Sequence, residues 1–189
     1  MRGCCGGVII ENQNGRSGLR LQEMNHVKKY QIASAGRQVN KSLARKKVII
    51  MKTIVLISCV SKKLSYKAQA KDLYISPLFR MNLQYAQKLT PSEIYILSAK
   101  YGLVGIYEKI EPYDVTLNTM PVKERKVWAD KVLEQISEYC DLQRDHFIIL
   151  AGQKYRQYLI PQLTSYEIPM QGLTIGKQLQ YLKRKIANE

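Results

Sequence analysis

"KTIVLIS", residues 52–58, is the stretch of sequence that decides the fold class. Its centre is a continuous run of apolar and mostly β-branched side chains, which is typical of a strand with both faces buried in a sheet. Similar runs follow at residues 93–97 and 146–151, and a shorter one at residues 166–169. The chain is therefore expected to form a sheet of about four strands.

Helical patterns separate these runs. Ser76 and Pro77 suit the N-cap and the first turn of a helix that continues through "LFRMNLQYAQKL". Further helices are predicted at residues 121–139, 153–159 and 175–186. Strands that alternate with helices predict an α/β fold of three layers, in which helices flank a mostly parallel sheet.

The first fifty residues differ from the rest of the chain. Residues 1–50 show neither helical nor strand periodicity and are rich in polar and basic side chains, so we expect a disordered basic leader. Met51 directly precedes the first predicted strand, which favours the hypothesis that translation starts there and that the leader is not authentic protein. An organellar presequence and a nucleic-acid-binding arm are the alternatives. Residues 51–189 are predicted to form a single α/β domain.

The net charge of +15 narrows the classes of partner. Residues 1–50 contribute +8, from ten basic against two acidic residues, and residues 51–189 contribute +7, from twenty against thirteen. This balance favours nucleic acid or nucleotides as partners, and the alternative is that the charge serves solubility alone. No apolar run is long enough to cross a bilayer, so a cytoplasmic location without a membrane partner is expected.

Cysteine and histidine spacing gives no sign of a metal site. The four cysteines and two histidines match neither a zinc pattern nor a disulfide framework, which favours reduced thiols in a cytoplasm. The glycine patterns of a P-loop and of a dinucleotide site are absent as well. The sequence therefore predicts neither a metal nor a cofactor.

Polar side chains follow three of the predicted strands, at the point where each strand ends. Because the carboxyl ends of parallel strands meet at one edge of a sheet, we expect these side chains to surround a single cavity. Ammonium, hydroxyl and phenol groups together suit a planar, anionic ligand such as a nucleotide or a nucleic-acid base. The alternative is that these are the ordinary residues of β–α turns. The side chains concerned are Ser58, Cys59, Ser61, Lys62, Ser98, Lys100, Tyr101, Gly102, Gly152 and Tyr155.

Residues 102–120 are predicted to form a long irregular connection, and loops of this length are often functional. Within it, Pro112 stiffens the chain, Tyr113 can cover a ligand, and Asp114 is a candidate general acid or base. A plain turn, in which the Asp114 side chain accepts a local N–H, explains the same residues. We take Asp114, Lys62 and Lys100 as the candidate catalytic residues.

Several of these motifs resemble known families. "SCVSKK", "AKDLYISPLF", "ILSAKYGLV", "IEPYDVTL", "LAGQKY" and "GLTIGKQLQYL", spread over residues 52–185, resemble a family of small bacterial and phage domains of undetermined function. More distantly, "SAKYGLV", "EPYDVTL" and "ILAGQKY" are similar to the YaaA-type peroxide-stress proteins. The cysteine, serine and lysine after the first strand are similar to a strand end in archaeosine synthases, which modify a deazaguanine base in transfer RNA.

These resemblances imply a pocket formed by the strand-end residues together with Pro112, Tyr113 and Asp114. The similarity to the YaaA-type proteins also implies DNA binding and protection from oxidative damage. This chain is shorter than those proteins and lacks room for their additional helical part, which puts the DNA binding in doubt. The sequence thus predicts an α/β protein that binds a nucleobase, a nucleotide or nucleic acid, and an enzyme acting on a base or glycosidic bond is one form of it. The alternatives are a non-catalytic DNA-binding protein of stress response or phage defence, and a protein-interaction module.

Overall fold

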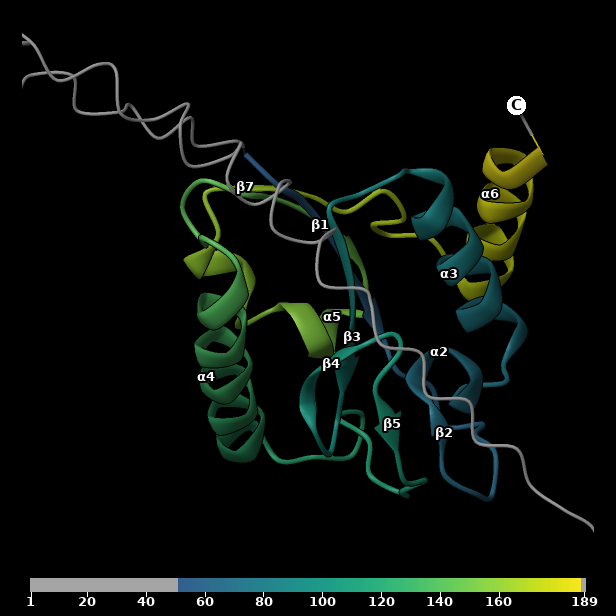
Figure 1. Cartoon of the computed structure of the whole chain (residues 1–189), viewed down its shortest axis with the longest axis horizontal. Helices are drawn as coiled ribbons and strands as arrows, with labels where there is room; N and C mark the ends of the chain where they lie inside the picture. Colours follow the sequence, from purple (N-terminus) through teal and green to yellow (C-terminus); the bar gives the residue numbers. More distant parts are fainter. Residues whose placement is uncertain (1–50, 188–189) are drawn as a thin grey trace, which may run out of the picture. The chain divides into compact units, whose positions relative to one another are not determined.

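The computed structural model describes residues 51–187, which form a three-layer α/β fold (Figure 1). A five-stranded sheet in the order β4-β3-β1-β6-β7 makes the middle layer. Its strands are β1 (Thr53–Ser58), β3 (Glu93–Ser98), β4 (Gly102–Gly105), β6 (His146–Leu150) and β7 (Ser165–Glu167). All neighbours in the sheet are parallel except β3 and β4. The predicted fold class is confirmed, and the predicted leader lies outside the described residues.

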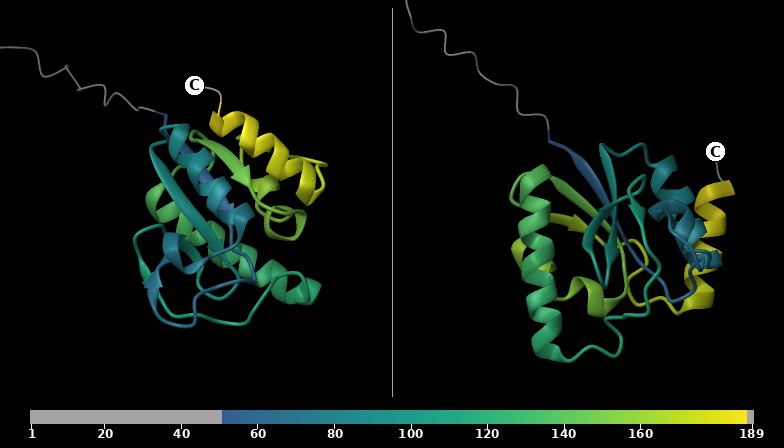
Figure 2. Two further views of the ribbon diagram at one scale, coloured as in Figure 1. Left: turned by 90° about the vertical axis from the view of Figure 1, so that its right-hand side faces the viewer. Right: turned by 60° about the horizontal axis from the view of Figure 1, so that its bottom comes forward.

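Helices cover both faces of this sheet. α4 (Val122–Tyr139) lies on one face, while α3 (Pro77–Lys88) and α6 (Ile175–Ala187) lie side by side on the other (Figures 1 and 2). α4 turns Trp128 and Val132 toward the sheet, four residues apart on one helical face. The Ser76 side chain caps α3 by accepting a hydrogen bond from the Phe79 N–H, as the Ser-Pro signal predicts.

β1 is the central strand because both of its faces are covered. The side chains from Ile54 to Ile57 are 0% exposed, and burying each of them contributes about 1.5–3 kcal/mol to folding. The parallel register places Ile57 opposite both Ile96 and Leu150. The carboxyl ends of β1, β3 and β6 therefore lie at the same edge of the sheet, as the sequence predicts.

The segment predicted as an irregular connection contains two further strands. Residues 102–105 form β4, antiparallel to β3, and β5 (Lys109–Ile110) pairs with β2 (Ala68–Gln69) beside the main sheet. The tight turn into β4 requires a positive φ of 85° at Gly102. The sheet has five strands where the sequence predicts about four, and β4 is the additional one, because "GLVG" is too short and too rich in glycine to show a strand pattern.

The remaining elements are short. α2 (Ala70–Leu73) precedes α3, and α5 (Gln153–Arg156) follows β6. The helix predicted to reach residue 159 ends early and is followed by a 3-10 turn at Ile160–Gln162, which contains a proline that cannot continue an α-helix. The chain leaves β1 toward β3 but leaves β6 toward β7, on the opposite side. The point between β1 and β6 is thus a topological switch point, where open α/β sheets commonly bind ligands.

Candidate functional site

A cavity of about 460 Å3 lies at the carboxyl ends of β1 and β6, at the topological switch point. We call it the β1–β6 cavity. The ends of these two strands form one part of its wall, and α3, α5, α6, the loop before α4 and the segment between β7 and α6 supply the rest. Its volume is within the range of small-molecule sites, roughly 300–1,000 Å3. Its wall is mixed, because Leu78, Ile168 and Leu173 give it apolar surface and many polar side chains from the same elements lie among them.

Asn82 is the most unusual residue of the cavity wall. It lies on the buried face of α3, one turn after Leu78, and its side chain is only 5% exposed. Its Oδ1 atom accepts no hydrogen bond from residues 51–187. A buried acceptor without a partner destabilises a fold by about 1–3 kcal/mol, so an apolar side chain would be more stable here. A ligand with an N–H or O–H donor would supply the partner.

Arg156 brings a positive charge to the same wall from the end of α5. Its Nη1 atom donates a hydrogen bond of 2.8 Å to the backbone oxygen of Ala151. Burial lowers the pKa of the Arg156 guanidinium, and none of the ion pairs among residues 51–187 involves it. Arg156 also lines an adjoining groove of about 410 Å3, so it stands between the two spaces. An anionic ligand in either space could therefore pair with Arg156 without competing with a carboxylate of the described chain.

Cys59 and Tyr155 form the inner end of the cavity. Both side chains are buried, and the Sγ atom of Cys59 lies 3.2 Å from the Tyr155 phenol oxygen. Burial, and then the neighbouring Cys59, raise the pKa of Tyr155, so its phenol keeps its proton near neutral pH. The indole of Trp128 meets the Tyr155 ring edge-on and donates a hydrogen bond of 2.9 Å to the Ser98 backbone oxygen. This packing holds the phenol in place.

A network of hydroxyl groups lies behind Cys59, centred on Tyr113. Ser98 donates a hydrogen bond of 2.7 Å to the Tyr113 oxygen, which lies 2.8 Å from the oxygen of Tyr74. Burial is the main cause of the raised pKa of Tyr113, followed by the neighbouring Cys59. Lys63 places its Nζ atom 4.3 Å from the centre of the Tyr113 ring, and burial lowers its pKa despite the nearby Cys59 and Asp114. The network joins the loop before α4 to the sheet edge.

The structure brings together half of the predicted ligand-binding residues in the cavity wall. Those that line it are Ser58, Cys59, Ser61, Gly152 and Tyr155. Ser98, Tyr101 and Tyr113 lie next to it, where the Tyr101 N–H donates to Ser98 Oγ and its ring meets Tyr113 edge-on at 5.5 Å. Pro112 precedes Tyr113 in the half-buried part of the loop, and Gly102 forms the turn into β4.

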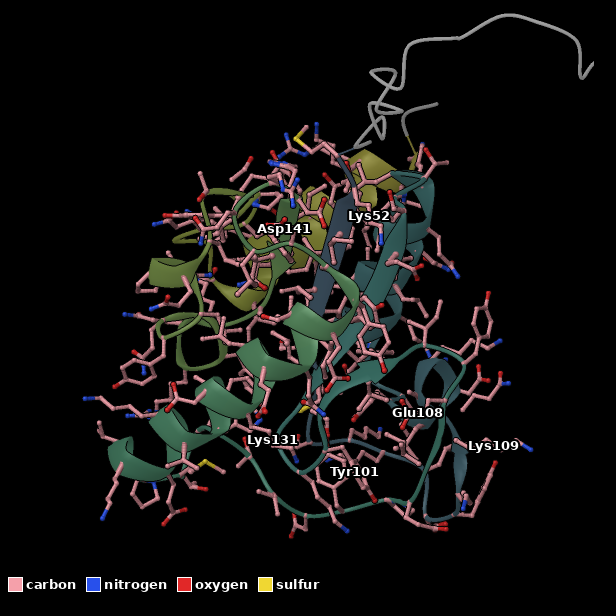
Figure 3. All side chains as sticks on the ribbon, turned by 60° about the vertical axis from the view of Figure 1, so that its left-hand side comes forward. Lys52, Tyr101, Glu108, Lys109, Lys131 and Asp141 are labelled. Carbon is pink, nitrogen blue, oxygen red and sulfur yellow. The ribbon has the colours of Figure 1, made fainter. Side chains whose placement is uncertain are left out.

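The three candidate catalytic residues lie outside the cavity wall. Lys62, Lys100 and Asp114 are all exposed. Lys100 places its Nζ atom 5.1 Å from the centre of the Tyr101 ring, and the charge of Asp114 acts on Lys63. Figure 3 shows Tyr101 at the end of the sheet away from Lys52, which lies at the start of β1.

Sequence reasoning did not single out Asn82, Arg156 or Lys63. A signal for Asn82 exists, since it is an amide on the apolar face of a predicted helix, three residues after Phe79. No signal distinguishes Lys63 from Lys62, because only the pairing of Lys63 with Tyr74 determines which ammonium group lies against the tyrosines.

The described part of the chain shows neither a metal site nor a membrane-spanning helix. Residues 51–187 contain no group of three or more His, Cys, Asp or Glu side chains that could hold a metal ion. Within the same range, every helix is too short or too polar to cross a membrane.

Comparison with known proteins gives a family but no relative of known activity. Residues 54–184 match a protein family described as a family of unknown function (DUF6884), and this range covers nearly all of the described fold. Neither a curated protein nor a solved structure matches the chain. The predicted resemblance to a domain family of undetermined function is confirmed.

Proposed function

The chain belongs to the DUF6884 family, whose function is unknown, and from the site itself we propose that the protein binds a nucleobase, nucleoside or nucleotide in the β1–β6 cavity. The observation that carries this proposal is the unpartnered Oδ1 atom of Asn82, buried in the wall of a cavity at the switch point of the sheet. A side-chain amide offers a donor and an acceptor side by side, as the edge of a nucleobase does.

The rest of the cavity wall supports the same class of ligand. Apolar side chains such as Leu78 and Leu173 suit the flat faces of a base, and the hydroxyls of Ser58 and Ser61 suit the oxygens of a sugar. The positive charge of Arg156 favours an anionic group. A strictly apolar ligand would leave Asn82 without a partner.

The test is to identify the small molecule that the full-length protein retains. The purified protein would be denatured and the released compounds examined by mass spectrometry. Thermal unfolding would then be followed with nucleobases, nucleosides and nucleotides, and with amino acids and sugar phosphates as a comparison panel. We expect a compound with a nucleobase to raise Tm in a dose-dependent manner. A Tm that responds only to the comparison panel would contradict the proposal.

Binding of duplex DNA is the second candidate function. Lys183, Arg184 and Lys185 are all exposed at the end of α6, far along the chain from the cavity residues of β1. Under this alternative, changing all three to Gln would weaken duplex binding and flatten its dependence on salt. Under the cavity proposal, the same triple variant keeps its affinity for the small ligand.

An enzymatic form of the proposal assigns a role to Asp114. The carboxylate is exposed next to the Tyr113 network and interacts with the charge of Lys63, so it can exchange protons with solvent. Asp114 lies outside the cavity wall but directly before Val115, which lines it, so this form requires the reacting part of the substrate to extend past Val115. In that case Asp114→Asn should abolish turnover of a bound base or glycosidic bond and retain most of the affinity. The similarity to YaaA-type proteins and archaeosine synthases stays a prediction, and no residue role here depends on it.

A further inference from the structure

Two side chains with binding capacity that the described chain does not fill enter the wall of the β1–β6 cavity from different elements. Asn82 comes from α3, and its Oδ1 atom accepts no hydrogen bond within residues 51–187. Arg156 comes from α5, and no carboxylate of the described chain forms an ion pair with it. The first side chain needs a hydrogen-bond donor from the ligand. The second already donates one hydrogen bond to the Ala151 backbone oxygen, and its charge and remaining N–H groups favour an anion.

These two requirements differ in chemistry. The amide of Asn82 can accept from one atom of a planar ring edge and donate to the next. The guanidinium of Arg156 is planar and permanently charged, and its parallel N–H groups match two oxygens of a phosphate. Leu78 and Ile168 add apolar surface to the same wall. A ligand that satisfies the whole wall therefore has a polar aromatic edge and a separate anionic group.

We infer that the ligand is a nucleoside 5′-monophosphate unit, with the base edge on Asn82 and the phosphate on Arg156. This inference rests on the proposed function and adds an orientation to it. Because Arg156 also lines the adjoining groove, the phosphate end of the ligand opens toward that groove. A free mononucleotide and the terminal nucleotide of a single strand present the same chemistry to these two residues.

The experiment measures the affinity of the full-length protein by isothermal titration calorimetry. The probes are the four ribonucleoside 5′-monophosphates, the four matching nucleosides, and ribose 5-phosphate. We expect at least one nucleotide to bind about tenfold or more tightly than its nucleoside, since a charged hydrogen bond adds to the base contacts. A short single strand with a 5′-phosphate is titrated in a separate arm.

Variants then assign each end of the ligand. Arg156→Gln should weaken nucleotide binding by about tenfold and leave nucleoside binding within about twofold, because only the nucleotide carries the phosphate. Asn82→Leu should weaken both ligands about equally, by about tenfold, because both carry the base. Gln84→Leu and Arg80→Gln change exposed side chains of α3 in the same way and should change neither affinity.

The outcomes separate this inference from the function on which it rests. Nucleotide and nucleoside affinities that fall equally in Arg156→Gln would overturn the placement of the phosphate, although the cavity would remain a nucleobase site. If no nucleobase compound binds the wild-type protein, the proposed function itself fails. If the strand binds more tightly than the mononucleotide and responds to both variants in the same pattern, the orientation is supported and the source of the nucleotide is a strand. Thermal unfolding of each variant checks that it is folded.

Discussion

The phenol oxygen of Tyr113 lies 2.7 Å from the hydroxyl oxygen of Ser98, which joins the loop before α4 to the end of β3. The same phenol lies 2.8 Å from the oxygen of Tyr74, which immediately follows α2. One side chain therefore connects three segments that are distant in sequence. Thr116, three residues after Tyr113, lines the β1–β6 cavity, so this network also sets the position of part of the cavity wall.

Removing the Tyr113 hydroxyl should destabilise the protein. In Tyr113→Phe, the hydroxyls of Ser98 and Tyr74 each lose a hydrogen bond in a partly buried site, and we expect the free energy of unfolding to fall by about 1–3 kcal/mol. Urea unfolding measures this change. Tyr107→Phe is the control, since Tyr107 is 66% exposed, and it should change stability by less than about 0.5 kcal/mol. Equal losses in the two variants would contradict a structural role of the network.

Alkaline pH should unfold the protein through its buried phenols. Burial raises the pKa values of Tyr74, Tyr113 and Tyr155 above that of an unfolded tyrosine, about 10. The stability associated with these shifts is fully present below pH ~10 and is lost as the pH rises above it, because the unfolded state releases protons that the folded state retains.

Urea unfolding at several pH values between about 8 and 11 tests this expectation. Stability should fall progressively above pH ~10, and less steeply in Tyr113→Phe, which lacks one of the shifted groups. A stability that is constant through pH ~11 would show that the phenols ionise equally well in the folded protein.

Gly102 should tolerate no side chain. Its φ of 85° is strained for any residue with a Cβ atom, and a Cβ here would clash with Oε1 of Gln135. That oxygen also accepts a hydrogen bond from the N–H of Leu103. We expect Gly102→Ala to lower the free energy of unfolding by about 2 kcal/mol or more.

A matched glycine provides the control for this variant. Gly105 ends the same strand, and a Cβ built on it meets nothing within 4 Å, so Gly105→Ala should have a small effect. Gln135→Ala alone measures the loss of its hydrogen bonds to Leu103 and Tyr101. Gly102→Ala should then cost less in the Gln135→Ala background than in the wild-type protein, because only the part due to the strained φ remains. Thermal and urea unfolding of the variants would separate the two contributions.

Asp145 joins the start of β1 to the end of α4 at the edge of the sheet opposite the cavity. Its Oδ1 atom accepts from the N–H of Lys52 at 2.9 Å and its Oδ2 atom from the N–H of Asp141 at 2.8 Å. Asp145→Ala leaves both N–H groups unpaired and should lower the free energy of unfolding by about 2–4 kcal/mol. Asp130→Ala, an exposed change on α4, should change it by less than about 0.5 kcal/mol in the same denaturation assay.

Replacing Asn82 should increase the stability of the ligand-free protein and weaken ligand binding. Because its Oδ1 atom is buried without a partner, Asn82→Leu should raise the free energy of unfolding of the ligand-free protein by about 1 kcal/mol. The same change should remove most of the increase in Tm that the ligand produces. A less stable ligand-free variant would show that the amide has a structural role, and Gln84→Leu is the control on the exposed side of α3.

Local sequence was sufficient for the strands of the core. Residues 53–58, 93–98 and 146–150 are apolar runs flanked by polar turns, and this pattern is a property of neighbouring residues. Parallel pairing then brings Cys59 and Gly152 to one edge of the sheet, which is why part of the cavity wall was predictable. Strand β4 could not be predicted in this way, because its four residues form a strand only by pairing with β3.

The sequence by itself determined the fold class and the edge of the sheet at which polar groups gather, because both follow from the alternation of buried strands and helices along the chain. Only the tertiary structure decided that Asn82 and Arg156 share a cavity. Seventy-four positions separate these two residues in the sequence, and their meeting depends on how α3 packs against the sheet and on which side β7 joins β6. Neither choice is encoded in a local pattern, since both depend on contacts between elements that are far apart along the chain.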